Sequence, residues 1–213
     1  MTCVNPPLPA TGLYAVTNGP RHDLLAAVRA ALEGGAAMLQ YRDKTDDHTR
    51  RLAEARELAA LTGEFGAPLI INDDVGLALA SGAQGVHLGE DDTGIATART
   101  ALGSAAIIGV SCYDSLQRAR DAAAAGASYL AFGAFFPTTT KTVTRRATPA
   151  LLREARALGL PLVAIGGITP DNGGPLIAAG ADFLAVVSAL FGASDVRAAA
   201  RQFAALFPSR EKA

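Results

Sequence analysis

The sequence predicts an α/β fold, a single (β/α)8 TIM barrel, on two observations. Eight apolar runs recur along the 213 residues, and segments of helical character separate them. The runs are continuous rather than alternating, which is typical of parallel strands covered on both faces. A repeat of roughly 27 residues is the length of one strand and one helix in an eightfold barrel.

Each expected strand is short and rich in aliphatic or aromatic residues. They are LYAVT from Leu13, AAMLQY from Ala36, PLIIN from Pro68, GVHLG from Gly85, IIGVS from Ile107, YLAFGAFF from Tyr129, PLVAIGGI from Pro161 and FLAVVSAL from Phe183. An open, doubly wound sheet is disfavoured because no Gly-x-Gly-x-x-Gly motif follows the first run.

The ends of the expected helices are also marked in the sequence. Four helical segments stop at a Gly-Ala pair that leads into the next strand, where glycine can adopt the left-handed conformation. These glycines are Gly35, Gly82, Gly126 and Gly180. Thr148-Pro149 and Thr169-Pro170 each place a capping hydroxyl before a proline at the first helical position.

The domain organisation follows from composition. Half of the residues are apolar, which indicates one compact domain at 13–207, between an N-terminal arm at 1–12 and a polar tail at 208–213. The net charge of −1 offers no field for nucleic acid or an anionic membrane surface, and no run could span a bilayer. Cys3 and Cys112 match no metal or redox spacing, so we expect passive thiols in a reducing cytoplasm.

Catalytic groups of such barrels lie at the carboxyl ends of the strands, and these positions are polar here. Alternation along the second strand places Gln40, Arg42 and Lys44 on one side, and Lys141 after the sixth strand faces the same mouth. Solvated loop charges are the alternative for each cation alone. Their convergence favours an anion site.

Asp73 and Asp92 follow neighbouring strands, so both carboxylates could reach one hard cation. Oxygen donors without a His or Cys cluster suit Mg²⁺. The alternative, that acidic residues in turns cap helices, is preferred for Asp74 and Asp91. His87 lies inside its strand and is expected to be a packed, hydrogen-bonded histidine rather than a base.

The ends of the last two strands suggest a monophosphate site. Gly166-Gly167 and Ser188 occupy the position where many barrels bind phosphate through backbone N–H groups. A tight turn is the alternative reading of the glycine pair.

These motifs together resemble the thiamine-phosphate synthase family. The matching stretches are LQYRDK, IINDD, GVHLGEDD, IGVSC, FGAFFPTTTK, AIGGIT and VVSALF, in that order. The resemblance implies a Mg²⁺-dependent transferase that joins hydroxymethylpyrimidine diphosphate to hydroxyethylthiazole phosphate, or its carboxylated form, and releases diphosphate. It also suggests a homo-oligomer, a dimer or a trimer.

The resemblance assigns roles residue by residue. Arg42, Lys44, Ser111 and Lys141 are implied to be catalytic, and Asp73 and Asp92 to bind magnesium. The implied substrate-binding residues are Gln40, Arg42, Asp43, Lys44, Asn72, Ser111, Thr138, Thr139, Thr140 and Lys141, together with the backbone at Gly167, Val187 and Ser188.

Two departures and two alternatives accompany the resemblance. Glu90 stands where members commonly carry glutamine, which adds a carboxylate near the expected metal, and Tyr41 stands at a variable apolar position. A related thiazole tautomerase needs the phosphate site but not the residues predicted for metal and diphosphate. A non-catalytic barrel that binds phosphorylated metabolites is the alternative from another class.

Overall fold

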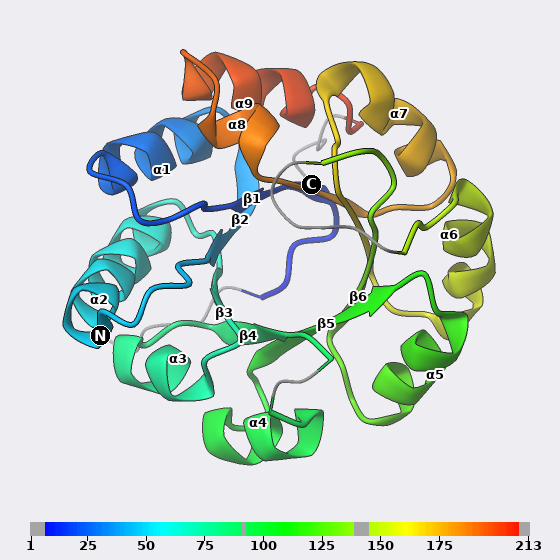
Figure 1. Ribbon diagram of the computed structural model, residues 1–213, viewed down its shortest axis with the longest axis horizontal. Coiled ribbons are helices and arrows are strands. Elements are labelled where there is room, and N and C mark those ends of the chain that lie inside the picture. Colours follow the sequence, from blue (N-terminus) through cyan, green and yellow to red (C-terminus); the bar gives the residue numbers. More distant parts are fainter. Residues whose placement is uncertain (1–6, 91–92, 139–144, 209–213) are drawn as a thin grey trace.

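The computed structural model describes residues 7–90, 93–138 and 145–208, and its strands form one closed parallel barrel (Figure 1). The strands are β1 (Gly12–Val16), β2 (Ala36–Tyr41), β3 (Leu69–Asn72), β4 (Gly85–Leu88), β5 (Ile107–Tyr113), β6 (Tyr129–Phe132), β7 (Leu162–Ile165) and β8 (Phe183–Val186). Each pairs with the next in sequence, and β1 closes the ring by pairing with β8. The predicted fold class is confirmed.

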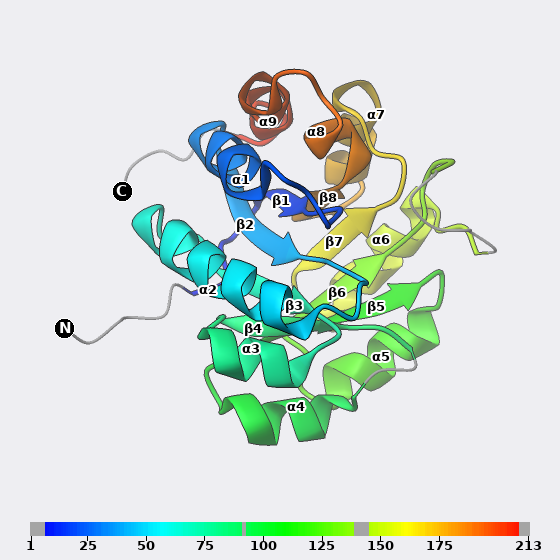
Figure 2. The same ribbon diagram turned by 60° about the vertical axis from the view of Figure 1, so that its left-hand side comes forward.

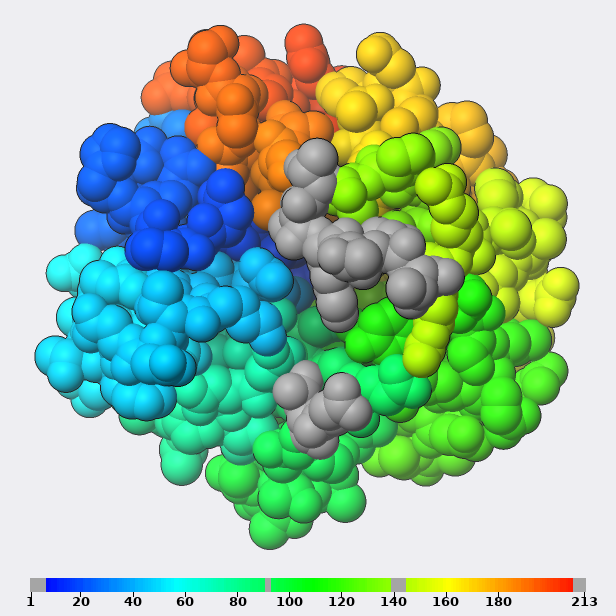
Figure 3. All heavy atoms as spheres, in the orientation of Figure 1, coloured from blue at the N-terminus to red at the C-terminus, as the bar shows by residue number. Residues whose placement is uncertain are grey.

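The helices form a layer outside the barrel (Figure 2). They are α1 (Leu24–Glu33), α2 (His48–Glu64), α3 (Val75–Ser81), α4 (Ile95–Leu102), α5 (Leu116–Ala124), α6 (Pro149–Ala155), the 3₁₀ turn η1 (Arg156–Leu158), α7 (Pro170–Ala178), α8 (Ser188–Phe191) and α9 (Val196–Ala204). In the space-filling view the colours follow the sequence around the perimeter (Figure 3). Within the described ranges, no helix is long and apolar enough to cross a membrane.

The core has two parts, which explains why the strands read as continuous apolar runs. Alternate strand residues such as Met38, Ile70 and Phe183 fill the barrel interior. Their neighbours, such as Leu39 and Leu184, pack against the helices. Because both faces of each strand are covered, no polar alternation is left in the sequence.

Helix ends agree with the sequence signals. The four predicted glycines all have positive φ, from 75° at Gly82 to 111° at Gly180. Thr148 and Thr169 are the N-cap residues of α6 and α7, each followed by proline. At α7 the Asn172 side chain accepts a hydrogen bond of 2.8 Å from the Thr169 N–H.

The sixth strand is shorter than its apolar run predicts. β6 ends at Phe132, and the chain then leaves the sheet to run beside the end of β7. There the Phe135 N–H donates to the Ile165 carbonyl at 3.2 Å and the Phe136 N–H to the Gly166 carbonyl at 3.0 Å. Residues 133–136 are therefore a packed loop rather than strand, and they carry the Pro-Thr sequence to the barrel mouth.

The structure describes the start of the barrel and one of the two cysteines. β1 begins at Gly12, one residue into the predicted arm, and Leu8 packs against the barrel interior. Cys112 is buried, and burial raises the pKa of its thiol to about 12, which suits a passive residue. Cys3 lies outside the described residues.

Candidate active site at the carboxyl ends of the strands

The end of β2 shows the predicted alternation. Gln40 points into the barrel, where its Nε2 donates to the Tyr14 hydroxyl at 2.9 Å. Tyr41 points outward and donates to Glu54 of α2 at 2.6 Å. Gln40 therefore reaches the interior, whereas Tyr41 anchors the strand to its covering helix.

Arg42 is held through its backbone. Its N–H donates to the Thr17 hydroxyl at 2.7 Å, and that hydroxyl donates in turn to the Arg42 carbonyl at 3.1 Å. Thr17 is fully buried at the end of β1. Among the described residues the Arg42 guanidinium has no hydrogen bond or ion pair, so it is available to an anion.

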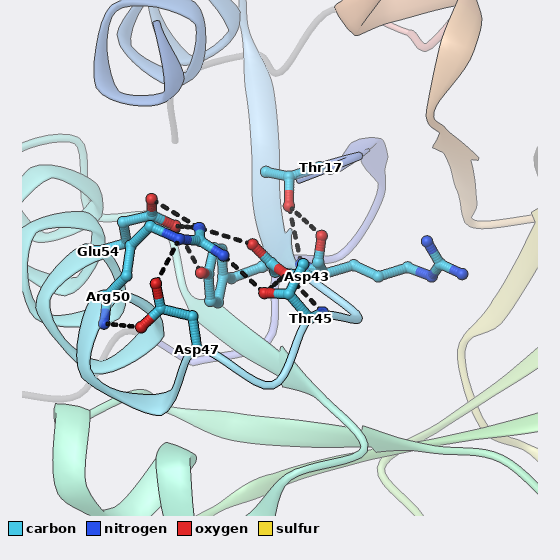
Figure 4. A network of polar contacts seen from close by, with 8 residues as sticks. Thr17, Asp43, Thr45, Asp47, Arg50 and Glu54 are labelled. Carbon is cyan, nitrogen blue, oxygen red and sulfur yellow. Dashed lines mark hydrogen bonds and ion pairs between the residues drawn. The ribbon is translucent and has the colours of Figure 1, made fainter. Parts of the chain in front are cut away.

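Asp43 organises the loop between β2 and α2 (Figure 4). Its side chain is fully enclosed and accepts hydrogen bonds from Arg50 at 2.8 Å and from the N–H and hydroxyl of Thr45 at 2.8 and 2.7 Å. Burial raises the pKa of Asp43, but the hydrogen bonds from Arg50 and Thr45 outweigh it and the net pKa is lowered. The carboxylate thus positions the loop, and its contact with substrate stays a prediction.

Asn72 and Asp73 lie at the end of β3, as predicted, and Lys44 joins them there. One carboxylate oxygen of Asp73 accepts from Asn72 Nδ2 at 2.6 Å and forms an ion pair with Lys44. Asp73 has a φ of 62°, which is uncommon for a residue other than glycine. Its N–H donates to the His87 carbonyl at 2.8 Å, which fixes this conformation against β4.

A shallow hollow of about 250 Å³ opens beside these side chains. It is lined by Asp43, Lys44, Thr45, Asp46, Arg51, Asn72, Asp73 and Asp74. Lys44, Asn72 and Asp73 are thus brought together at one polar hollow in the rim. This convergence is what the spacing of the motifs predicts.

Magnesium binds oxygen atoms, and this hollow offers a carboxylate at Asp73. Asp73 supplies one carboxylate, and Asp92 lies outside the described residues. Within the described part of the chain, no group of three His, Cys, Asp or Glu side chains could hold a metal. Magnesium usually needs only one or two protein carboxylates, because waters and substrate phosphates supply the rest. The oxygen donor at Asp73 therefore fits this ion.

Asp74 has the capping role expected for it. Its side chain accepts from the Leu77 N–H at 2.8 Å at the start of α3 and pairs with Arg51 at 3.1 Å. Asp91, the other predicted cap, is outside the described residues.

Ser111 lies at the end of β5 and is linked to a buried polar chain. Its hydroxyl is 2.9 Å from His87 Nε2, and His87 Nδ1 is 2.9 Å from the Tyr129 hydroxyl. The Tyr129 hydroxyl is 2.8 Å from that of Tyr14, which receives Gln40. Two predicted site residues on distant strands, Gln40 and Ser111, are thus joined through the barrel interior.

The expectation for His87 is confirmed, because it is buried and hydrogen-bonded at both nitrogens. Burial lowers the pKa of His87 to about 4, against the opposing charge of Asp73. Burial also raises the pKa of Tyr14 and of Tyr129, so both hydroxyls stay protonated. The sequence analysis missed Tyr14 and Tyr129, although a tyrosine within a buried strand usually requires a partner for its hydroxyl.

The ends of β7 and β8 lie side by side, as the predicted phosphate site requires. Gly166 and Gly167 follow β7 with φ of 104° and 65°, and Val187 precedes the short α8, which begins at Ser188. A Cβ at Gly167 would lie 2.3 Å from the Pro137 carbonyl oxygen. Glycine therefore lets the loop that carries Thr138 lie directly on the turn after β7.

The remaining predicted residues of that loop, Thr139, Thr140 and Lys141, are outside the described residues, and their roles stay predictions.

Glu90, the departure from the family pattern, is paired. Its carboxylate lies 3.1 Å from Arg145, and the Arg145 guanidinium lies 5.0 Å from the centre of the Tyr113 ring. Arg145 offsets the added negative charge, and the contact connects the loop after β4 with residues that follow β6.

Comparison with known proteins identifies the family. The chain matches the thiamine monophosphate synthase family over residues 13–190. It is 57% identical to a thiamine-phosphate synthase of Xanthomonas campestris pv. campestris, over 93% of this chain and 96% of that protein. A thiamine-phosphate synthase of Thiobacillus denitrificans is 56% identical, over 92% and 94% of the two chains.

A solved structure agrees with this result. Thiamine phosphate pyrophosphorylase from Pyrococcus furiosus superposes with a TM-score of 0.83 at 36% identity, over 92% of this chain and 95% of that one. The resemblance inferred from the sequence motifs is confirmed. The chain therefore belongs to the thiamine monophosphate synthase family and is a transferase of the thiamine-phosphate synthase type.

Proposed function

We propose that the protein joins hydroxymethylpyrimidine diphosphate to hydroxyethylthiazole phosphate, or to its carboxylated form, giving thiamine phosphate and diphosphate. One observation carries the proposal: the barrel mouth has two positions suited to anions, separated by β1. The first consists of Arg42, directly after β2, together with Lys44 and Asn72 at the hollow beside β3, and the second consists of the glycine turn after β7 and the start of α8. Two phosphorylated substrates need two such positions.

The residues at the first position would stabilise the departing diphosphate. Arg42 offers a guanidinium that has no partner within the described residues, and Lys44 offers an ammonium now paired with Asp73. Positive groups already in place lower the cost of charge that builds up on leaving oxygens. The cations of this chain therefore serve departure of the leaving group.

Asp73, with Asp92 as its predicted partner, would hold magnesium at this position. When bound, the ion would supply further positive charge to the diphosphate oxygens. The thiazole nitrogen attacks with its own lone pair, so the chain needs no general base for the nucleophile. Holding both substrates in one mouth supplies proximity.

The proposal is tested by turnover of the two substrates with purified protein. Thiamine phosphate is followed after oxidation to its fluorescent product, with Mg²⁺ and with EDTA. We expect product only with Mg²⁺, and about 100-fold less with Arg42→Met because one cationic contact is lost. Arg201→Met, an exposed arginine on α9, is the matched control and should keep wild-type rates.

Two results would contradict the proposal. Isomerisation of the thiazole phosphate without joining would indicate the tautomerase alternative, and binding of both substrates without product would indicate the non-catalytic barrel. Equal rates in EDTA would remove magnesium from the mechanism. The expected homo-oligomer is measured separately by light scattering.

A further inference from the structure

A chain of hydrogen bonds crosses the barrel interior and ends at Ser111. It runs from Gln40 Nε2 to the Tyr14 hydroxyl at 2.9 Å, to the Tyr129 hydroxyl at 2.8 Å, to His87 Nδ1 at 2.9 Å and from His87 Nε2 to the Ser111 hydroxyl at 2.9 Å. Both tyrosines are at most 1% exposed and lie among apolar side chains. No water-facing partner is therefore available to either hydroxyl.

The number of hydrogen atoms fixes the direction of the chain. The Gln40 amide donates to Tyr14, so the single hydroxyl hydrogen of Tyr14 has the Tyr129 oxygen as its acceptor. Tyr129 has then received a hydrogen and gives its own to His87 Nδ1. In the reverse direction the Tyr14 hydrogen would be buried without an acceptor, which is costly.

This direction determines what His87 offers to Ser111. An imidazole that accepts at Nδ1 carries its hydrogen on Nε2, because the neutral ring has one donor and one acceptor nitrogen. His87 therefore donates to the Ser111 oxygen at 2.9 Å. The Ser111 hydroxyl has its own hydrogen left to donate, and it lies at the end of β5 where the mouth opens.

We propose that Tyr14, Tyr129 and His87 are positioning residues that fix Ser111 as a hydrogen-bond donor to the pyrimidine diphosphate, rather than as an activated nucleophile. The inference rests on the proposed function for the identity of the ligand. Diphosphate oxygens can only accept hydrogen bonds, so a donor at Ser111 matches them. The close Ser111–His87 pair resembles a nucleophile with its base, but a protonated Nε2 cannot take the serine proton.

The first test reads the position of the hydrogen on His87 directly. Protein with ¹⁵N-labelled histidine is studied by long-range ¹H–¹⁵N NMR at pH 7.5, and the His87 signals are assigned by their loss in His87→Gln. We expect hydrogen on Nε2 and none on Nδ1. Hydrogen on Nδ1, or on both nitrogens, would overturn the proposal. This readout needs no turnover, so it is independent of whether the proposed reaction is correct.

The second test uses variants matched in shape. His87→Gln keeps an N–H group that can donate to Ser111, whereas His87→Met has similar length and no donor. We expect kcat to fall about tenfold or less in the glutamine variant and about 100-fold in the methionine variant, with KM for the thiazole phosphate unchanged. Equal kcat values in two folded variants would contradict the positioning role.

Removal of a hydrogen bond on the side of His87 that faces away from Ser111 should affect Ser111 through His87. Tyr129→Phe deletes the donor to Nδ1, so we expect the ¹⁵N signal of Nδ1 to move toward that of an acceptor nitrogen without a hydrogen bond, with hydrogen still on Nε2, and kcat to fall. Thr62→Val is the control, because it removes a fully buried hydroxyl of α2 far from the mouth. Unchanged His87 signals in Tyr129→Phe would overturn the direction inferred here.

Discussion

Lys44 and Asp73 form an ion pair across the ends of β2 and β3. The pair joins a cation predicted to bind diphosphate to a carboxylate predicted to bind magnesium. Lys44 is 58% exposed and Asp73 26%, so the pair itself contributes little to stability. In the proposed reaction the two side chains can separate, because Lys44 can then pair with the diphosphate and Asp73 with magnesium.

Replacement of Asp73 should raise the magnesium requirement. For Asp73→Asn we expect the Mg²⁺ concentration at half-maximal rate to increase by about tenfold or more, because a charged ligand is lost. A magnesium titration of the initial rate measures this. Asp121→Asn, an exposed change on α5, should leave the titration unchanged, and an unchanged titration for Asp73→Asn would exclude its role as a ligand.

Replacement of Lys44 should act on the leaving group. For Lys44→Met we expect kcat/KM for the pyrimidine diphosphate to fall by about 100-fold, since one electrostatic contact to the diphosphate is lost. Steady-state kinetics with the thiazole phosphate held at saturation measure the change. The KM for the thiazole phosphate should stay within about twofold, because that substrate is assigned to β7 and β8. Rates like those of wild type would remove Lys44 from the mechanism.

A side chain at Gly167 should disturb the turn after β7, which is proposed to bind the thiazole phosphate. For Gly167→Ala we expect a loss of stability beyond ordinary backbone strain and a higher KM for the thiazole phosphate, because the new Cβ would meet Pro137. Gly66→Ala is a close control, with a φ of 64° against 65° and open space around its Cβ. Urea unfolding of both variants separates the strain that they share at positive φ, about 1–2 kcal/mol, from the contact that only Gly167 makes.

Loss of the Asp43 charge should make the loop after β2 less stable in a pH-dependent way. The pKa of Asp43 is lowered in the folded protein, so its charge contributes stability above the unfolded pKa of about 3.8. That contribution is lost as the pH falls through the folded value. We expect Asp43→Asn to be about 1–3 kcal/mol less stable than wild type at pH 7 and the difference to shrink below pH 4. Urea unfolding at pH 7 and pH 3 checks this, and an equal difference at both would contradict it.

The sequence predicts the barrel well because its signals are local. Each apolar run, each glycine at a helix end and the alternation of Gln40, Tyr41 and Arg42 depend on neighbouring residues only. The pairing of Lys44 with Asp73 was within reach of the same reasoning, since parallel strands end at one rim.

The interior hydrogen-bond chain was not predictable in this way. Tyr14 and Tyr129 lie 115 positions apart, and each reads as one more large residue in an apolar run. The hydrogen bond between them forms because the register of the closed barrel places both side chains in the interior at the same level along its axis. The structural role of Asp43 was not predictable either. The alternation of side chains along β2 does not reveal that the Asp43 carboxylate is buried and paired with Arg50.

The pairing of β1 with β8 also affects how the chain is made. The ring of strands cannot close until residues 183–186 have left the ribosome, although β1, which pairs with them, is made before the other seven strands. Until then the free edges of the nascent sheet expose unpaired backbone groups, which can pair with other chains. A ribosome that stalls before Phe183 would therefore release an aggregation-prone product, whereas one that stalls after α9 would release a barrel that can close.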